Sequence, residues 1–132
     1  MRIVLDTNVL ISGLLRPHGP PASVVRLVLA GELLLLADER ILLEYEEVVA
    51  RSRLGIAADL AAHVCCFLRR HCEMLVAKPV ACILPDADDL PFLETALAGR
   101  AQALITGNLK HYPAASRRIV RVCSPAEFLR DI

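Results

Sequence analysis

The sequence has no excess of charge of either sign, because 15 lysines and arginines balance 15 aspartates and glutamates. It therefore lacks the basic character of a protein that holds nucleic acid by electrostatic attraction alone. The balance is still compatible with an RNA or DNA substrate, since binding depends on local patches and an enzyme can use a metal ion to hold phosphate. It argues against a simple architectural binder of nucleic acid.

Long apolar runs are also missing. The most apolar continuous run, Leu33 to Ala37, is far shorter than the roughly 20 residues that a membrane-spanning helix requires. Met1 is followed almost at once by the first apolar segment, which leaves no room for a signal peptide. The five cysteines, an odd number, indicate free thiols in a reducing compartment. We therefore expect a cytoplasmic protein with no membrane segment.

The sequence lacks the paired spacing of a zinc site as well. His63, Cys65, Cys66, His71 and Cys72 lie close together, but no CxxC pair is present. On a helix the two adjacent cysteines would point about 100° apart. We interpret these thiols as packing residues.

What is present is a chain of 132 residues that is 55% hydrophobic, with no internal repeat and no linker. This length and composition predict one folded domain over residues 1–132 with a single core. Apolar runs predict strands at residues 2–5, 33–36, 74–76, 103–105 and 119–122. Helical spacing predicts helices over residues 8–15, 22–30, 38–51, 57–71, 88–98 and from 125 onward, with a loop at 17–21. This alternation predicts an α/β fold, a three-layer α/β/α sandwich around a central, mainly parallel sheet.

Asp6 directly follows the first predicted strand, Arg2 to Leu5. Open α/β sheets place their ligand sites at the carboxyl ends of strands, so Asp6 is a candidate functional residue. Its alternative role is to cap the helix that follows, a task that Thr7 or Asn8 could perform equally well.

Other acidic and polar residues also occur where elements begin or end. Glu44 borders the apolar face of the predicted helix 38–51, but Glu46 borders its other edge, and periodicity alone does not choose between them. The acidic residues of segment 86–89 open another helix, and the polar segment 106–108 follows the strand at 103–105. We expect these ends to meet at one edge of the sheet.

Clustered carboxylates repel one another unless a cation holds them together. Oxygen ligands alone select hard cations such as Mg²⁺ or Mn²⁺. Such a site can activate water for attack on a phosphodiester.

Four segments resemble the PIN domain family, in order and with suitable spacing. They are Val4–Leu10, Glu39–Glu44, Asp86–Ala96 and Ile105–Pro113, and the end of the chain, Cys123–Leu129, also fits. The resemblance covers essentially the whole chain and is to the VapC-like toxin ribonucleases of type II toxin–antitoxin pairs. It implies a metal-dependent endoribonuclease that hydrolyses RNA, with a cognate antitoxin protein as partner.

By position, Asp6, Glu44 and Asp89 match the acidic residues of the family, and Thr106 matches its strand-end hydroxyl. Asn108 stands where many members have an aspartate, and the amide keeps an oxygen ligand but loses a charge. The resemblance implies that Asp6 and Asp89 ligate Mg²⁺ or Mn²⁺ directly, Asn108 does so through its oxygen or a water, and Glu44 orients the attacking water. The expected catalytic and metal-binding set is Asp6, Glu44, Asp89 and Asn108, supported by Thr7, Asn8 and Thr106.

Several plainer interpretations stay open. Glu44 can be a solvated helix-edge charge, Asp89 a helix cap, and Thr106 and Asn108 ordinary turn residues. A degenerate PIN fold that binds RNA or a protein without cutting is the alternative function. A dehalogenase-like phosphatase also begins with a strand and an aspartate, but it needs a second acid where this chain has Asn8. The leucine-rich helices suggest a homodimer, although a buried core explains them equally well.

Overall fold

The computed structural model describes residues 1–132, with the exception of the side chain of Ser52. Five strands form one sheet in the order β3-β2-β1-β4-β5, and each neighbouring pair is parallel. The strands are β1 Arg2–Leu5, β2 Leu34–Ala37, β3 Glu73–Met74, β4 Ala103–Ile105 and β5 Val122–Cys123. The sheet is therefore fully parallel, whereas the sequence predicted a mainly parallel one.

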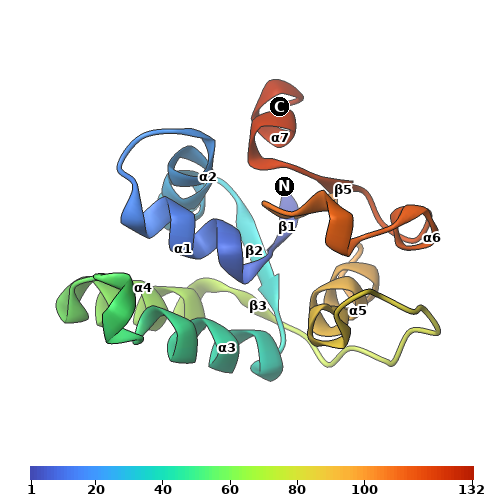
Figure 1. Ribbon diagram of the computed structural model, residues 1–132, viewed down its shortest axis with the longest axis horizontal. Coiled ribbons are helices and arrows are strands. Elements are labelled where there is room, and N and C mark those ends of the chain that lie inside the picture. The colour runs from blue at the N-terminus through green and yellow to red at the C-terminus, as the bar shows by residue number, and fades with distance from the viewer.

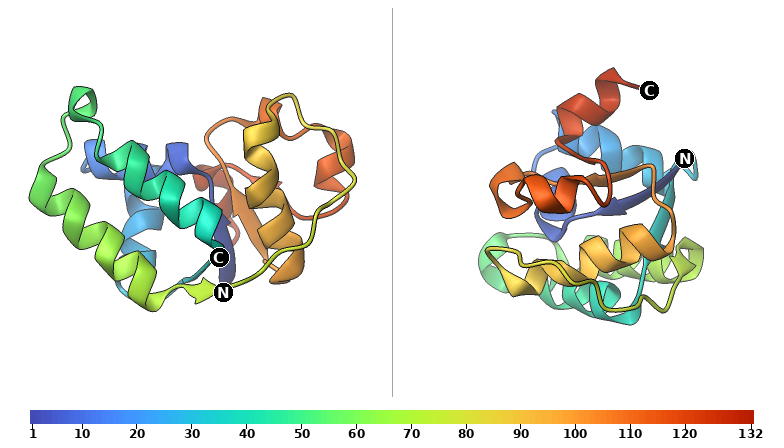
Figure 2. Two further views of the ribbon diagram at one scale, coloured as in Figure 1. Left: turned by 90° about the horizontal axis from the view of Figure 1, so that it is seen from below. Right: turned by 90° about the vertical axis from the view of Figure 1, so that its right-hand side faces the viewer.

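Helices cover both faces of this sheet. Figures 1 and 2 show α3, α4 and α5 on one side of the sheet and α1, α2 and α7 on the other. The α-helices are α1 Thr7–Leu15, α2 Pro20–Leu29, α3 Glu39–Val49, α4 Ala58–His71, α5 Leu90–Ala98, α6 Ala114–Arg117 and α7 Pro125–Arg130. Three short 3₁₀-helices are η1 Ser52–Leu54, η2 Ala87–Asp89 and η3 Leu109–His111. The predicted three-layer α/β/α sandwich is confirmed.

The order of the strands creates a switch point in the middle of the sheet. The chain runs from β1 outward to β2 and β3, then crosses back to place β4 on the other side of β1. Because the crossovers leave β1 in opposite directions, the carboxyl ends of β1 and β4 lie at the switch point, which is where open α/β sheets bind ligands. Asp6 follows β1 and Thr106 follows β4, so both residues lie at this point.

The core lies on both sides of the three central strands, in which residues 3–5 of β1, 35–37 of β2 and 103–105 of β4 are almost completely buried. This explains why these strands are continuous apolar runs without alternation. Helices α1 and α2 pack so closely that a Cβ on Gly13 would lie 2.5 Å from Val25 Cγ2. A side chain at position 13 would therefore force the two helices apart.

Three predicted boundaries were wrong. Helix α2 begins at Pro20, inside the predicted loop 17–21, because proline suits the first turn of a helix. The predicted strand 119–122 is reduced to Val122–Cys123, since the N–H groups of Ile119 and Val120 donate to the Ser116 carbonyl in the turn after α6. Helix α5 starts at Leu90, because the residues before it form η2.

The remaining differences are small. Strand β2 is shifted by one residue from the predicted 33–36, and β3 occupies Glu73–Met74 in place of 74–76. Two helix starts are capped by side chains: Asp38 accepts a hydrogen bond from the Ile41 N–H, and Ser124 forms a capping box with Glu127.

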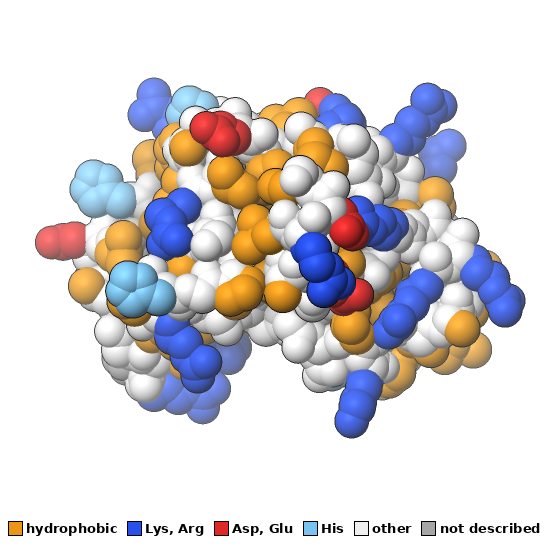
Figure 3. Space-filling view, turned by 90° about the horizontal axis from the view of Figure 1, so that it is seen from above, with side chains coloured by type: hydrophobic (Ala, Val, Ile, Leu, Met, Phe, Trp, Pro, Cys, Tyr) orange, Lys and Arg blue, Asp and Glu red, His pale blue; other side chains and the backbone are white. Residues whose placement is uncertain are grey.

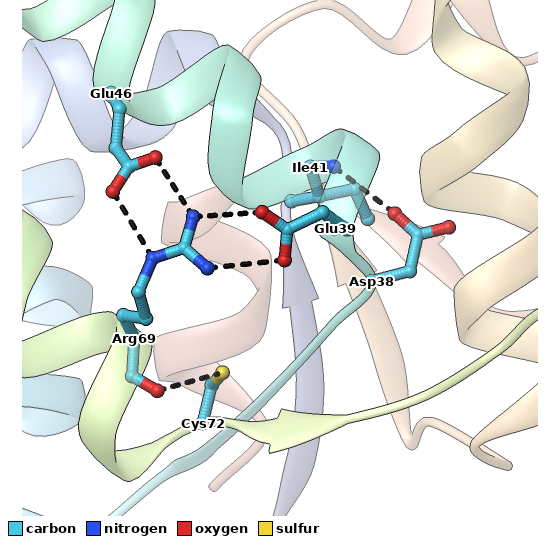
Figure 4. Close-up of polar contacts among 6 residues, drawn as sticks. All are labelled: Asp38, Glu39, Ile41, Glu46, Arg69 and Cys72. Carbon is cyan, nitrogen blue, oxygen red and sulfur yellow. Dashed lines mark hydrogen bonds and ion pairs between the residues drawn. The ribbon is translucent and has the colours of Figure 1, made fainter.

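Helices α3 and α4 are joined by an ion-pair cluster, shown in Figure 4. The Arg69 guanidinium on α4 donates to both carboxylate oxygens of Glu39 and of Glu46, at 2.8–3.2 Å. Glu46 is thus paired with Arg69 at the α3–α4 contact. The ambiguity between Glu44 and Glu46 is decided by this packing.

Among the residues that the structure describes, no helix combines the length and apolar character needed to cross a membrane.

Candidate active site

Asp6 lies at the centre of the site and is 5% exposed. Its backbone occupies the cap position of α1, but its side chain makes no capping hydrogen bond. Instead, Asp6 Oδ2 accepts a hydrogen bond from Thr106 Oγ1 at 2.8 Å and a longer one from the Tyr112 hydroxyl at 3.4 Å. The interpretation of Asp6 as a side-chain helix cap is therefore wrong, and its carboxylate faces the end of β4.

Thr7 and Glu44 connect α1 with α3. The Thr7 hydroxyl donates a hydrogen bond to Glu44 Oε2, and the Glu44 side chain is half-buried. Burial raises the pKa of Glu44, and the nearby charges of Asp6 and Asp88 add to this effect while Thr7 opposes it. Glu44 is thus not a solvated helix-edge charge, because it faces Thr7 and is close enough to Asp6 to feel its charge.

Asp89 stands at the start of α5 and is 8% exposed. It makes no side-chain capping hydrogen bond, so its plainer interpretation as a helix cap is also wrong. His111 Nδ1 lies 2.8 Å from Asp89 Oδ2, yet this buried oxygen has no hydrogen-bonding partner among the described residues. This contact is an ion pair when His111 is protonated, and it favours the charged form of Asp89.

The two buried aspartates disfavour each other's charge. Burial raises the pKa of Asp89 to about 6, and the charge of Asp6 contributes to this shift while His111 opposes it. Burial also raises the pKa of Asp6, in spite of the hydrogen bonds from Thr106 and Tyr112 that favour its carboxylate. A cation bound between these two carboxyl groups would favour the charged form of both.

The remaining predicted residues have supporting contacts. Asn8 Oδ1 accepts a hydrogen bond from the Gly107 N–H at 2.9 Å and so ties the start of α1 to the loop after β4. The Asn108 N–H donates to Thr106 Oγ1 at 3.1 Å, which holds the hydroxyl that faces Asp6. No hydrogen bond links the Asn108 side chain to Asp6, Glu44 or Asp89 within the described structure. The fold thus brings Asp6, Thr106 and their partners together, while the Asn108 amide stays outside this set of contacts.

Two residues of the site were not assigned from the sequence. His111 and Tyr112 belong to the segment Ile105–Pro113 that carried the resemblance, but neither has a periodic or capping pattern that marks it. They reach the aspartates because η3 turns the chain back over the ends of the strands. The one sequence signal by which these two residues could have been assigned to the site is their closeness to Thr106.

The residues present fit a hard divalent cation in the kind of donor they offer. Two buried carboxylates at a strand edge, one with an unpartnered oxygen, match the one or two carboxylates by which Mg²⁺ is usually held alongside waters. Over the described side chains, no three histidine, cysteine, aspartate or glutamate groups are gathered into a ready ligand set. The fit therefore rests on Asp6 and Asp89 as a pair.

Comparison with known proteins adds to these observations. A family model described as PIN domain matches residues 2–110. Among solved structures, the crystal structure of VapBC2 from Rickettsia felis bound to a DNA fragment from their promoter is similar with a TM-score of 0.58. The alignment covers 92% of this chain and 97% of that chain at 17% sequence identity, which makes it a likeness of fold. No curated protein sequence matches the chain.

Proposed function

The chain belongs to the PIN domain family, and on that premise we propose that it is a cytoplasmic, metal-dependent endoribonuclease, the toxin of a toxin–antitoxin pair. The observation that carries this proposal is the pair Asp6 and Asp89, both buried at the switch point of the sheet and both with a raised pKa. Strongly perturbed carboxyl groups at a ligand-binding edge are typical of functional sites.

In this mechanism Asp6 and Asp89 would hold Mg²⁺ or Mn²⁺. Asn108 would contribute through its oxygen or a water. When bound, the cation neutralises the aspartates, lowers the pKa of water and stabilises the charge that develops at phosphorus. Thr106 fixes the orientation of the Asp6 carboxylate by its 2.8 Å hydrogen bond.

Glu44 would act on the attacking water. Its pKa is raised by burial, and its Oε2 accepts a hydrogen bond from Thr7, so the carboxylate is held toward Asp6. A carboxylate with a raised pKa is better suited to accept a proton from water. The role of Thr7 is then to position this base.

On the face seen from above, lysine and arginine side chains are scattered among hydrophobic ones (Figure 3). This distribution agrees with the zero net charge of the chain. In the proposed mechanism the cation would contact the reacting phosphate.

The experiment is a cleavage assay on single-stranded RNA oligonucleotides. We expect cleavage with Mn²⁺ and none in excess EDTA. Asp6→Asn should reduce the rate by about 100-fold or more, because the lost metal interaction contributes several kcal/mol. Asp59→Asn, an exposed acid on α4, is the matched control and should retain the full rate. Undiminished cleavage by Asp6→Asn would refute the proposal.

We also propose an antitoxin protein as partner and a homodimer as the assembled form. The VapBC2 complex from Rickettsia felis supports only the fold of this chain, so the partner needs its own test. The product of a small reading frame beside the gene should bind the purified chain and suppress RNA cleavage. Sedimentation velocity should show a dimer, and a monomer at all concentrations would contradict the second proposal.

A non-catalytic PIN fold that binds RNA or a protein is the second candidate function. It is favoured by the neutral Asn108 and by the absence, over the described side chains, of a gathered set of three metal-binding groups. Calorimetric titration with Mn²⁺ separates the two candidates. Binding that disappears in Asp6→Asn supports the enzyme, and no binding by the unmodified chain supports the alternative.

A further inference from the structure

A groove lies beside the candidate active site, where the first turns of α1, α2 and α7 meet the loop after β4. Its volume of about 330 Å³ is at the lower end of the range for ligand-binding pockets. Asn8 and Gly107 line it, and the first of these lies two residues after Asp6 while the second directly follows Thr106. The groove therefore begins at the site itself.

The lining of the groove is uncharged and rich in proline. No charged side chain of the described structure belongs to it. Pro20 and Pro21 open α2, and Pro125 opens α7. Because proline has no N–H, these helix starts lose the first backbone donors by which a helix N-terminus binds phosphate. The groove is therefore unsuited to a phosphate group, and its proline rings offer flat, apolar surfaces instead.

Two polar side chains on α1 line the groove. Asn8 and Ser12 are four residues apart in the helix, so they lie on the same face, whereas Thr7 is turned toward Glu44. Asn8 Oδ1 accepts the Gly107 N–H at 2.9 Å, which leaves the Nδ2 group of the amide as a donor. No hydrogen bond to the Ser12 hydroxyl occurs among the described residues. The groove thus combines apolar surfaces with two polar groups that are available to a ligand.

We propose that this groove holds the nucleoside next to the scissile phosphate of an RNA substrate, and that Asn8 and Ser12 position its base. This inference rests on the proposed ribonuclease function. Proteins recognise single-stranded RNA by stacking its bases on flat side chains and by hydrogen bonds to the base edges. In the groove the proline rings supply the surface for stacking, and Asn8 Nδ2 and the Ser12 hydroxyl supply the hydrogen bonds.

The test removes the base and fills the groove in separate steps. RNA oligonucleotides that are cut at one known bond are prepared with an abasic ribose on one side or the other of that bond. The unmodified chain should cleave one of these two substrates with kcat/KM lowered about tenfold. Ala126→Leu enlarges an exposed side chain that lines the groove at the start of α7, and it should lower kcat/KM for intact RNA by about the same factor.

The combination of both changes locates the base in the groove. If Ala126→Leu acts by displacing the base, it should have little further effect on the sensitive abasic substrate. Ser12→Ala removes only a hydroxyl and should lower kcat/KM about threefold for intact RNA, with no change for that abasic substrate. Ala58→Leu, at the exposed start of α4, is the matched control and should behave as the unmodified chain does. Circular dichroism verifies that each variant is folded.

The outcomes distinguish this inference from the function on which it rests. Undiminished cleavage of both abasic substrates by the unmodified chain, or equal losses on intact and abasic RNA in Ala126→Leu, would overturn the role of the groove and leave the ribonuclease function standing. No cleavage of intact RNA by the unmodified chain in the presence of Mn²⁺ would overturn both.

Discussion

Two pairs of buried acidic residues in this protein differ in whether an arginine forms ion pairs with them. Asp38 and Glu94 are 6% and 7% exposed, and Arg40 lies between them, with its guanidinium 2.8 Å from Asp38 Oδ2 and 2.9 Å from Glu94 Oε1. Asp6 and Asp89 are buried to the same degree, but no lysine or arginine of the described structure forms an ion pair with either. Arg40 therefore supplies the positive charge that compensates Asp38 and Glu94.

The difference has a physical consequence. A buried charge is costly unless a partner compensates it, and a protein retains such a cost only where another interaction repays it. Arg40 joins the start of α3 to α5, and Glu94 also accepts the Val80 N–H at 3.0 Å, so the first pair fixes three segments together. Asp6 and Asp89 have no arginine of this kind, and the proposed function assigns these two carboxylates to a metal ion.

The largest expected effect comes from removing the internal cation. Arg40→Met strands two carboxylates and should lower the free energy of unfolding by about 2 kcal/mol, less than for a fully buried pair because the arginine is half-exposed. Urea unfolding measures this. Arg51→Met, which breaks an exposed pair with Glu47 at 3.6 Å, is the control and should change little. Equal losses of unfolding free energy in Arg40→Met and Arg51→Met would contradict the view that Arg40 compensates two buried carboxylates.

Removing the charge of Asp89 should instead increase the free energy of unfolding of the metal-free chain. The pKa of Asp89 is raised from 3.8 to about 6, so the folded state binds more protons than the unfolded state between these values. The stability of the metal-free chain should therefore fall as pH rises from about 4 to about 6, in place of the rise seen with a salt-bridged carboxylate. Asp89→Asn should remove this loss and stabilise the metal-free chain by about 1 kcal/mol near pH 7.

Thermal unfolding across this pH range, in EDTA, measures the effect. Asp59→Asn removes an exposed carboxylate instead and should leave the pH dependence of the unmodified chain in place. A destabilised Asp89→Asn would show that Asp89 contributes to the fold as Asp38 does.

The smallest expected effect concerns the hydrogen bonds that partly support Asp6. Tyr112→Phe removes a long bond of 3.4 Å to Asp6 Oδ2, while the bond from Thr106 at 2.8 Å stays, so stability should fall by only about 0.5 kcal/mol. Tyr45→Phe removes a short hydroxyl bond to the Leu5 carbonyl at 2.5 Å and should cost about 1 kcal/mol. Urea unfolding of both variants ranks them, and a larger loss for Tyr112→Phe would mean that Asp6 depends on this hydroxyl.

Most of the fold was predictable because its signals are local. The apolar run at 103–105, for example, forms a strand in the structure as predicted. The errors fall where two local rules compete, as at Pro20, which is both a loop residue and a good first residue of a helix. The beginning of the predicted strand 119–122 was wrong for a similar reason, because the apolar residues Ile119 and Val120 belong to the turn after α6.

The candidate site was only partly predictable. The positions of Asp6 and Thr106 at strand ends follow from the sequence, and the structure joins them by a hydrogen bond across 100 residues. The predicted metal-binding and catalytic roles of Asp6, Glu44, Asp89 and Asn108 remain predictions. His111 was missed because a single 3₁₀ turn, and not a repeated pattern, brings it to Asp89.

The sequence by itself therefore determined the layers, the parallel sheet and the acids at its ends, because periodicity and capping act over a few residues. Only the tertiary structure decided which acid receives a cation. Glu44 and Glu46 are equivalent by spacing, but in the folded chain Glu46 accepts a hydrogen bond from Arg69 and Glu44 accepts one from Thr7. Asp38 and Asp89 both precede a helix, yet Arg40 reaches only the first. Whether a buried charge is compensated depends on which distant side chains the fold brings within a few ångströms, and local patterns do not contain that information.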